Sequence, residues 1–173
     1  VNGTLTVTGG NTQLYPGGSF LTVNPGGRIT GPSKLMFNVG SFIMSQKGTI
    51  DVSTTEFISG ANWPFIPNGR YDSPSVIFRG QDQAYTVYMG SGNIVFGGTV
   101  TYVCEDVNRF NINNSIYNPN LIFENNVITS TNCAESFNFT KGTGTITFAG
   151  TSAQSVTFGG RSVDNIITSN TSS

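Results

Sequence analysis

The sequence predicts an all-β fold, a parallel β-helix or solenoid with loop insertions, and three observations lead to it. Short runs that alternate apolar and polar residues end repeatedly at Gly-Gly or Pro-Gly, as strands bounded by turns do. β-branched residues are abundant, and helix-favouring residues never recur at helical spacing. Similar runs return near both ends of the chain, which is typical of rungs stacked along one axis.

The composition predicts a single domain over 1–173 and leaves one alternative fold open. A chain of 173 residues is long enough to bury a sizeable core. Gly, Thr, Ser and Asn make up 81 of the 173 residues, but 13 Phe and 6 Tyr supply the apolar side chains that disordered chains lack. An antiparallel β-sandwich or jelly roll is the alternative, because alternating strands joined by glycine turns also build those folds.

The first 60 residues contain the clearest recurring unit. The run Gly3–Gly10 is echoed by Phe20–Gly27, and Gln13–Gly18 lies between them. Two further alternating runs follow, at Arg28–Gly31 and Lys34–Gly40. Glycine after proline lets the backbone turn a corner, so each run is expected to be one strand of a rung.

The C-terminal third repeats this pattern. Its four runs are Phe137–Thr140, Gly144–Gly150, Ser155–Gly160 and Asn165–Thr168. The spacing between runs is irregular, so the sequence predicts stacked rungs without a repeat of fixed length.

The middle of the chain, 61–133, departs from the pattern and is interpreted as an inserted, loop-rich region. Residues 61–75 contain three prolines and the only tryptophan, which indicates a long loop. Strand character returns in five short runs, at 76–78, 85–88, 93–96, 99–103 and 121–123.

The Leu21–Gly27 and Gly144–Gly160 runs resemble the parallel β-helix repeats of bacterial cell-surface adhesins and related fibre and spike proteins. The resemblance covers about 1–60 and 135–170 and is one of composition and turns. It implies an elongated, extracellular protein with an adhesive or structural role, and it carries no catalytic residues over to this chain.

Charge and composition argue against several functions. The net charge of −1 offers no basic surface for nucleic acid or anionic lipid. Histidine is absent, which removes histidine-based acid–base catalysis and histidine metal sites, and no run approaches the about 20 apolar residues that span a bilayer. We expect no enzyme activity, no cofactor, no metal and no membrane insertion.

Two sets of acidic residues are candidates for catalysis or calcium binding, and the sequence favours neither role. Glu105 and Asp106 are adjacent, so on a strand they point to opposite sides and do not form a paired glycosidase site. With Asn108 and Asn111 they could offer oxygen ligands to Ca²⁺, but a solvated, asparagine-rich loop explains the segment better.

Cys104 and Cys133 are the only cysteines. A disulfide between them would fit an oxidising, extracellular setting, and two buried free thiols are the alternative.

A ligand-binding site is expected around the aromatic loop, with Trp63, Arg70, Tyr71 and Asp72 as its contact residues. Aromatic rings stack on the apolar faces of sugars, while Arg and Asp hydrogen-bond sugar hydroxyls. The alternative is that Trp63 packs with Phe65 as a hydrophobic lid over the solenoid.

These features predict an extracellular or cell-surface adhesive module, or fibre tip, that recognises a surface glycan or another host-cell surface ligand without catalysis. A purely structural stalk, coat or filament segment is the second hypothesis, and a polysaccharide-cleaving domain like those of phage tail spikes is the third. Stacked rungs leave open strand edges at both ends, so we expect flanking domains of a longer chain or a homotrimer to cover them.

Overall fold

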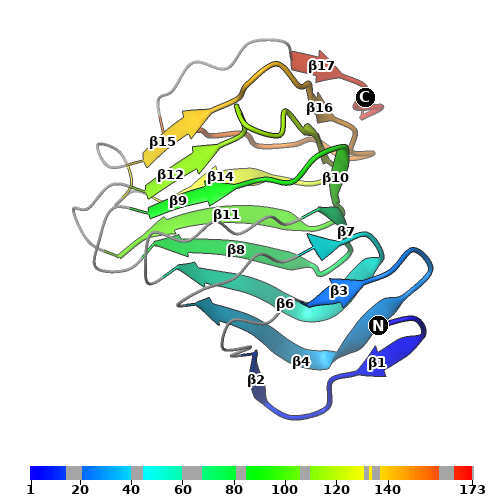
Figure 1. Ribbon diagram of the computed structural model, residues 1–173. Helices are drawn as coiled ribbons and strands as arrows, with labels where there is room; N and C mark the ends of the chain where they lie inside the picture. The colour runs from blue at the N-terminus through cyan, green and yellow to red at the C-terminus, as the bar shows by residue number, and fades with distance from the viewer. Residues whose placement is uncertain are drawn as a thin grey trace.

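The computed structural model is a parallel β-solenoid (Figure 1). Every strand pair in the described part of the chain is parallel, which confirms the predicted solenoid and excludes the antiparallel sandwich for those residues. The structure describes residues 1–14, 21–39, 45–59, 68–80, 85–105, 110–130, 133, 137–159 and 166–172.

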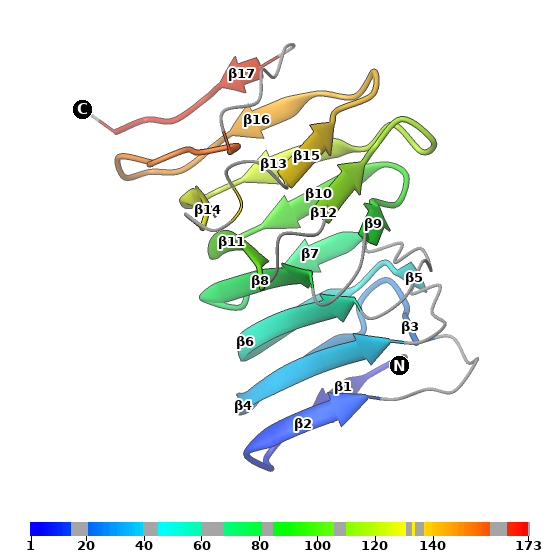
Figure 2. The ribbon, with the colours of Figure 1, turned by 90° about the vertical axis from the view of Figure 1, so that its left-hand side faces the viewer.

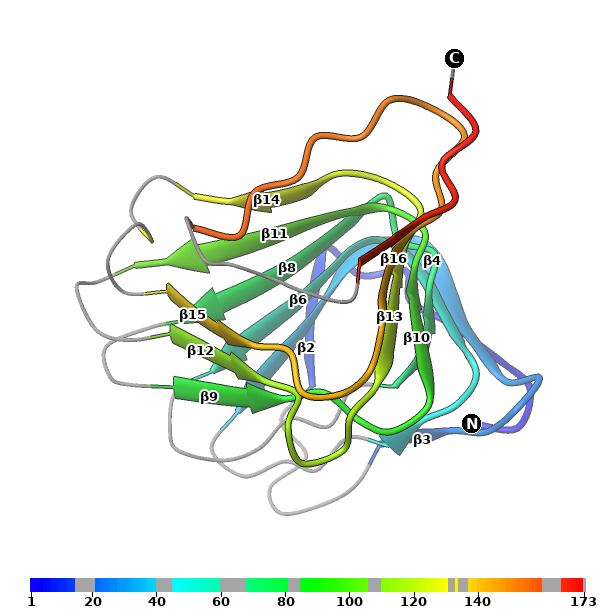
Figure 3. The same cartoon turned by 90° about the horizontal axis from the view of Figure 1, so that it is seen from above.

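The first face of the solenoid stacks strand segments from one end of the molecule to the other. Seen along the axis, it forms one wall of a three-sided coil (Figure 3). In stacking order its members are β1 (Thr4–Thr6), the first halves of β4 (Arg28–Val39) and β6 (Thr49–Ser59), β7 (Gly69–Tyr71), β10 (Asn93–Phe96), β13 (Asn120–Phe123), β16 (Ile146–Phe148) and β17 (Ile166–Thr168).

The second face continues from the same long strands after a corner. Its members are β2 (Asn11–Leu14), the second halves of β4 and β6, β8 (Ser75–Gly80), β11 (Thr99–Cys104) and β14 (Val127–Thr129) (Figure 2). The stack closes with a single bridge from Val127 to Val156.

The third face has two described patches of sheet. β3 (Thr22–Val23) pairs with β5 (Ser45–Gln46), and β12 (Phe110–Asn113) lies between β9 (Tyr85–Tyr88) and β15 (Phe137–Thr140).

The middle of the chain is not an insertion outside the stack, so the prediction for 61–133 is corrected. Each turn of the coil is called a level here. In the described part of that region, β7 to β14 supply the central levels of all three faces. The sequence does not reveal β7, because its three residues show too little alternation to be recognised as a strand.

The corner between the first and second faces depends on a glycine in β4. The strand pairing shifts register between Gly31 and Lys34, where the chain turns from one face to the next. Gly31 has φ +146°, and a Cβ atom there would lie 2.0 Å from the carbonyl oxygen of Val7. Only glycine fits this corner.

The core consists of columns of side chains. Within a column, the aromatic ring on one level packs on the aromatic ring of the next level. On the second face the ring centroids of Phe37 and Phe57 are 5.2 Å apart, those of Phe57 and Phe78 4.8 Å, and those of Phe78 and Tyr102 5.7 Å. These spacings follow from the ~4.8 Å separation of neighbouring strands, because parallel pairing in register puts equivalent residues directly above one another.

A second aromatic column fills the first face. Tyr71, Phe96 and Phe123 stack at 5.5 and 5.3 Å, and Phe123 stacks on Phe148 at 5.8 Å. The two columns meet edge to face, with Phe78 and Phe96 6.1 Å apart. The described phenylalanines are therefore core residues, each buried between the three faces.

Within the described residues, no helix is long and apolar enough to cross a membrane.

Replacing Phe78 with alanine tests the aromatic column. Phe78 is fully buried and contacts rings on both neighbouring levels, so Phe78→Ala is expected to lower the free energy of unfolding by about 3–5 kcal/mol in denaturant titrations. Tyr117→Ala, at a side chain 40% exposed, is the control and should change it by less than about 1 kcal/mol. Equal effects of the two substitutions would contradict this account of the core.

Candidate functional site

The predicted contact residues do not form one surface. Trp63 lies outside the described residues. Tyr71 is fully buried, with its ring stacked on Phe96 and edge-on to Phe57 at 5.7 Å. The prediction that Tyr71 contacts a ligand is therefore wrong, because Arg70 and Tyr71 are neighbours on β7 and point to opposite sides of the sheet.

The Tyr71 hydroxyl is buried and has no hydrogen-bond partner among the described residues. Burial raises the pKa of this phenol well above its ordinary value, and it does the same for Tyr102. Both side chains stay neutral at physiological pH and act as core rings.

Arg70 lies on the outer side of the first face and is held by two carboxylates. Its Nη1 and Nη2 donate to Glu124 Oε1 and Oε2 at 3.0 and 2.8 Å, which is a bidentate pair. Its Nε lies 2.6 Å from Asp72 Oδ1. The hydrogen bonds that Arg70 donates to Glu124 raise the pKa of the guanidinium, so Arg70 stays charged.

This group, called the Arg70 clamp here, joins β7 to β13 across the intervening strand β10. Gly97 follows β10 at the level between the two carboxylates, and a Cβ atom there would lie 2.8 Å from Asp72 Oδ1. A larger residue would crowd the clamp. The side chains of Arg70, Asp72 and Glu124 are 42%, 29% and 34% exposed, so the clamp is partly open to solvent.

A second ion cluster, called the Glu56 cluster here, lies on the outer side of the second face and consists of Lys34, Glu56, Arg79 and Glu105. Glu56 is only 1% exposed and pairs with Lys34 from β4 and with Arg79 from β8, whose Nε lies 2.6 Å from Glu56 Oε1. Arg79 also reaches Glu105, with Nη1 2.5 Å from Oε1. Burial alone would raise the pKa of Glu56, but hydrogen bonds and positive charge from Lys34 and Arg79 lower it below its ordinary value.

Every carboxylate in the described part of the chain is paired with a cation. Besides the Arg70 clamp and the Glu56 cluster, Asp51 pairs with Arg28 on the neighbouring strand. The geometry supports cross-level pairing that stabilises the stack. Asp106 and Asn108, two of the four residues considered as calcium ligands, lie outside the described residues.

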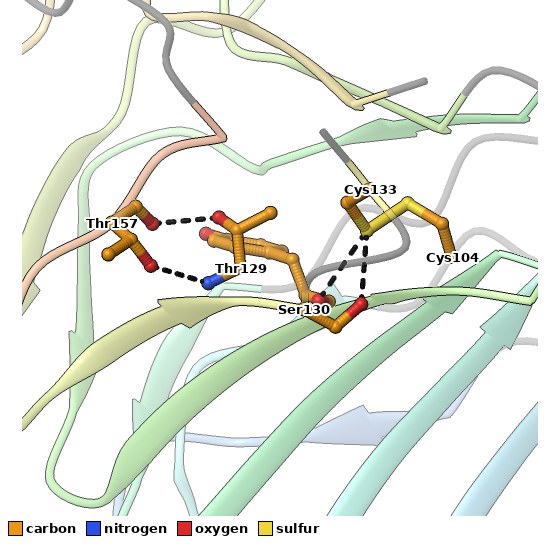
Figure 4. The surroundings of a disulfide bond; sticks show 6 residues. Cys104, Thr129, Ser130, Cys133 and Thr157 are labelled. Atoms are coloured by element: carbon orange, nitrogen blue, oxygen red, sulfur yellow. Dashed lines mark hydrogen bonds between the residues drawn. A yellow bond between two sulfur atoms is a disulfide. The ribbon is translucent and has the colours of Figure 1, made fainter. Parts of the chain in front are cut away.

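Cys104 and Cys133 form a disulfide, with their sulfur atoms 2.11 Å apart (Figure 4). Cys104 ends β11, and both cysteines are buried. The Ser130 hydroxyl lies 3.5 Å from Cys133 Sγ, and the Tyr102 carbonyl oxygen lies 3.7 Å from it. The bond ties the segment after β14 to the second face, next to the aromatic column.

Glu124 is the residue of the Arg70 clamp that sequence reasoning missed. It is 54 residues from Arg70, and no local motif links the two. The sequence feature that could have revealed it is the alternation over Leu121–Glu124. Once this run is recognised as a strand, the alternation places the side chains of Ile122 and Glu124 on the outer side of the sheet.

Removing the disulfide should destabilise the fold without changing it. The bond closes a loop with a sequence separation of 29, so the variant C104A/C133A is expected to lose about 3–4 kcal/mol of unfolding free energy. Chemical denaturation with and without reductant measures this. Reductant should weaken the wild type to about the level of the variant and leave the variant, which has no cysteine, unchanged. A wild-type unfolding free energy that reductant does not change would argue against the bond.

The Glu56 cluster predicts a loss of stability in acid. Because the folded-state pKa of Glu56 is lowered, its contribution is present above the unfolded pKa of about 4.3 and is lost as pH falls through the folded value. E56Q should lower the unfolding free energy by about 1.5–3 kcal/mol at pH 7, the worth of a hydrogen bond to a charged group. The difference in unfolding free energy between the variant and the wild type should shrink as pH falls below about 4.3 and through the folded-state pKa, and a difference that does not depend on pH would contradict the assignment.

No family model matches the chain, and neither a curated protein nor a solved structure is significantly similar to it.

Proposed function

We propose that this chain is a rigid, non-catalytic structural segment of an extracellular protein, such as a stalk, coat or filament segment. The observation that carries the proposal is the unbroken stack: side-chain columns of the core run through the levels of the first and second faces. Such a stack holds its two ends at a fixed separation, which is the task of a spacer.

Two further features support this role and its location. The buried disulfide is typical of proteins that fold in an oxidising, extracellular compartment. The described outer faces carry ion pairs that link different levels, and these pairs stabilise the stack. With a net charge of −1, the chain offers little attraction to nucleic acid.

A glycan-binding adhesin is the second candidate. It is favoured by Arg70 and Asp72, which remain partly exposed on the outer side of the first face directly after the segment that contains Trp63. In this case Trp63 would supply the stacking surface, and the Arg70 clamp would supply hydrogen bonds to hydroxyl groups. Flanking domains or two further copies in a trimer would present the site.

A polysaccharide-cleaving spike domain is less favoured, because the described carboxylates are each paired with a cation. Such an enzyme would need carboxylates from neighbouring chains. Release of reducing ends or unsaturated sugars from a host polysaccharide would support it.

A glycan-binding screen separates the two leading roles. The intact domain is compared with Trp63→Ala and with Tyr117→Ala, which removes an exposed aromatic ring in the turn after β12. A structural segment is expected to bind no glycan selectively in any of the three forms. Selective binding that is lost in Trp63→Ala and kept in Tyr117→Ala would overturn the structural role and establish a lectin-like adhesin.

A further inference from the structure

Four asparagines of the chain stand in the pattern Asn-X-Ser/Thr, the acceptor motif for N-linked oligosaccharides in secreted proteins. They are Asn2, Asn113, Asn138 and Asn170. The motif arises readily in an asparagine-rich chain, so the motif alone identifies no site. The structure separates the four by the way each side chain is placed.

Asn138 lies on β15, where the alternation of the strand presents the whole motif to solvent. Phe137 and Phe139 point into the core, and Asn138 and Thr140 are exposed on the outer side. The Asn138 side chain forms no hydrogen bond with the described residues. Its amide nitrogen is therefore open to a covalent substituent, and the hydroxyl-bearing residue of the motif lies on the same side of the strand.

The amide of Asn170 is occupied by the fold. Its Nδ2 donates to the carbonyl oxygen of Ser152 at 2.8 Å and to Gln154 Oε1 at 2.7 Å. A sugar linked to this nitrogen replaces one of its two hydrogens, so one of the two hydrogen bonds would be lost.

Asn113 and Asn2 are also tied to neighbouring residues. Asn113 is half-buried on β12, and its Oδ1 accepts hydrogen bonds from the backbone N–H and the hydroxyl of Ser115, the third residue of its own motif. Asn2 is exposed, and its Oδ1 accepts a hydrogen bond from Asn24 Nδ2. Of the four acceptors, Asn138 is the one with an exposed side chain and no hydrogen bond to the described part of the chain.

The surface around Asn138 suits a neutral, hydroxyl-rich substituent. Strands β9, β12 and β15 form one wall of the coil seen along its axis (Figure 3). The pairing register places Asn111 directly beside Asn138 on this wall. Amides and hydroxyls both donate and accept hydrogen bonds, as sugar hydroxyls do. The described outward side chains of the wall are all of these uncharged types: Thr86, Tyr88, Asn111, Asn113, Asn138 and Thr140.

We infer that Asn138 is an acceptor of an N-linked oligosaccharide, an inference that rests on the extracellular location in the proposed function. The buried disulfide is typical of chains that pass through an oxidising compartment such as the lumen of the endoplasmic reticulum. A glycan at Asn138 would project from the outer side of the third face and leave the core columns and the ion pairs of the other two faces untouched.

The transfer is a substitution at carbon and involves no oxidation or reduction. The donor is an oligosaccharide joined to a lipid through a diphosphate. The Asn138 Nδ2 forms a bond to the anomeric carbon of the first sugar, and the bond from that carbon to the diphosphate oxygen breaks. The amide loses one proton to a base, and the lipid diphosphate leaves with the electron pair.

Expression behind a secretion signal in a glycosylating eukaryotic host tests the inference. Peptide mass spectrometry with fragmentation locates the glycan before and after treatment with an amidase that removes N-linked glycans and leaves aspartate at the site. Both secreted protein and protein from the membrane fraction of the cells are measured. Circular dichroism verifies the fold of each secreted form.

Four substitutions on the outer side of the third face make the test specific. Asn138→Gln removes the acceptor, and Thr140→Ala removes the hydroxyl that the motif requires; both are expected to abolish the glycan at this position. Thr140→Ser restores a hydroxyl and should keep the glycan. Asn111→Gln, at the neighbouring asparagine that stands in no motif, is the matched control and should also keep it.

A wild-type chain whose Asn138 stays unmodified in both fractions overturns the inference. A glycan at this position that persists in Thr140→Ala, or glycosylation at Asn170 in place of Asn138, also overturns it. A chain that is secreted with its disulfide formed but without a glycan leaves the proposed structural role standing, and the glycan-binding screen tests that role separately.

Discussion

The structure depends on parallel pairing in register, which places equivalent side chains of successive levels directly above one another. Ring columns such as Phe37, Phe57 and Phe78 form because neighbouring strands are separated by about one ring spacing. Each ring covers two others, so the apolar surface of one level is buried by the next and no level is stable alone. The described phenylalanines of a polar chain thereby form a continuous core.

The same register organises the outer faces. A cation on one level finds a carboxylate on a neighbouring level, as Arg28 finds Asp51, or reaches two levels away, as Arg70 reaches Glu124 past Gly97. These pairs keep the scarce charges of the chain in contact with each other. The pairs between different levels hold neighbouring strands of the stack together.

The two leading functions depend on different features of the outer faces. The described carboxylates there are paired with cations, most of them on other levels, and the proposed structural segment rests on these pairs. The glycan hypothesis depends instead on Trp63 and on the solvent-exposed part of the Arg70 clamp.

The sequence by itself determined that the fold is all-β, because period-two alternation and glycine turns are local properties of each strand. Parallel pairing, which separates the solenoid from the antiparallel sandwich, is a contact between distant segments and came from the tertiary structure. The sequence also limited a possible disulfide to the pair Cys104 and Cys133, because the chain has only two cysteines. Only the tertiary structure decided which residues meet across levels. Along the outer column of the first face, one turn takes 20 residues from Thr147 to Ile167 and 27 from Val95 to Ile122. With turns of such unequal length, no fixed spacing in the sequence connects Arg70 to Glu124. The sequence also does not show that the side chain of Tyr71, next to Arg70 on a three-residue strand, points into the core.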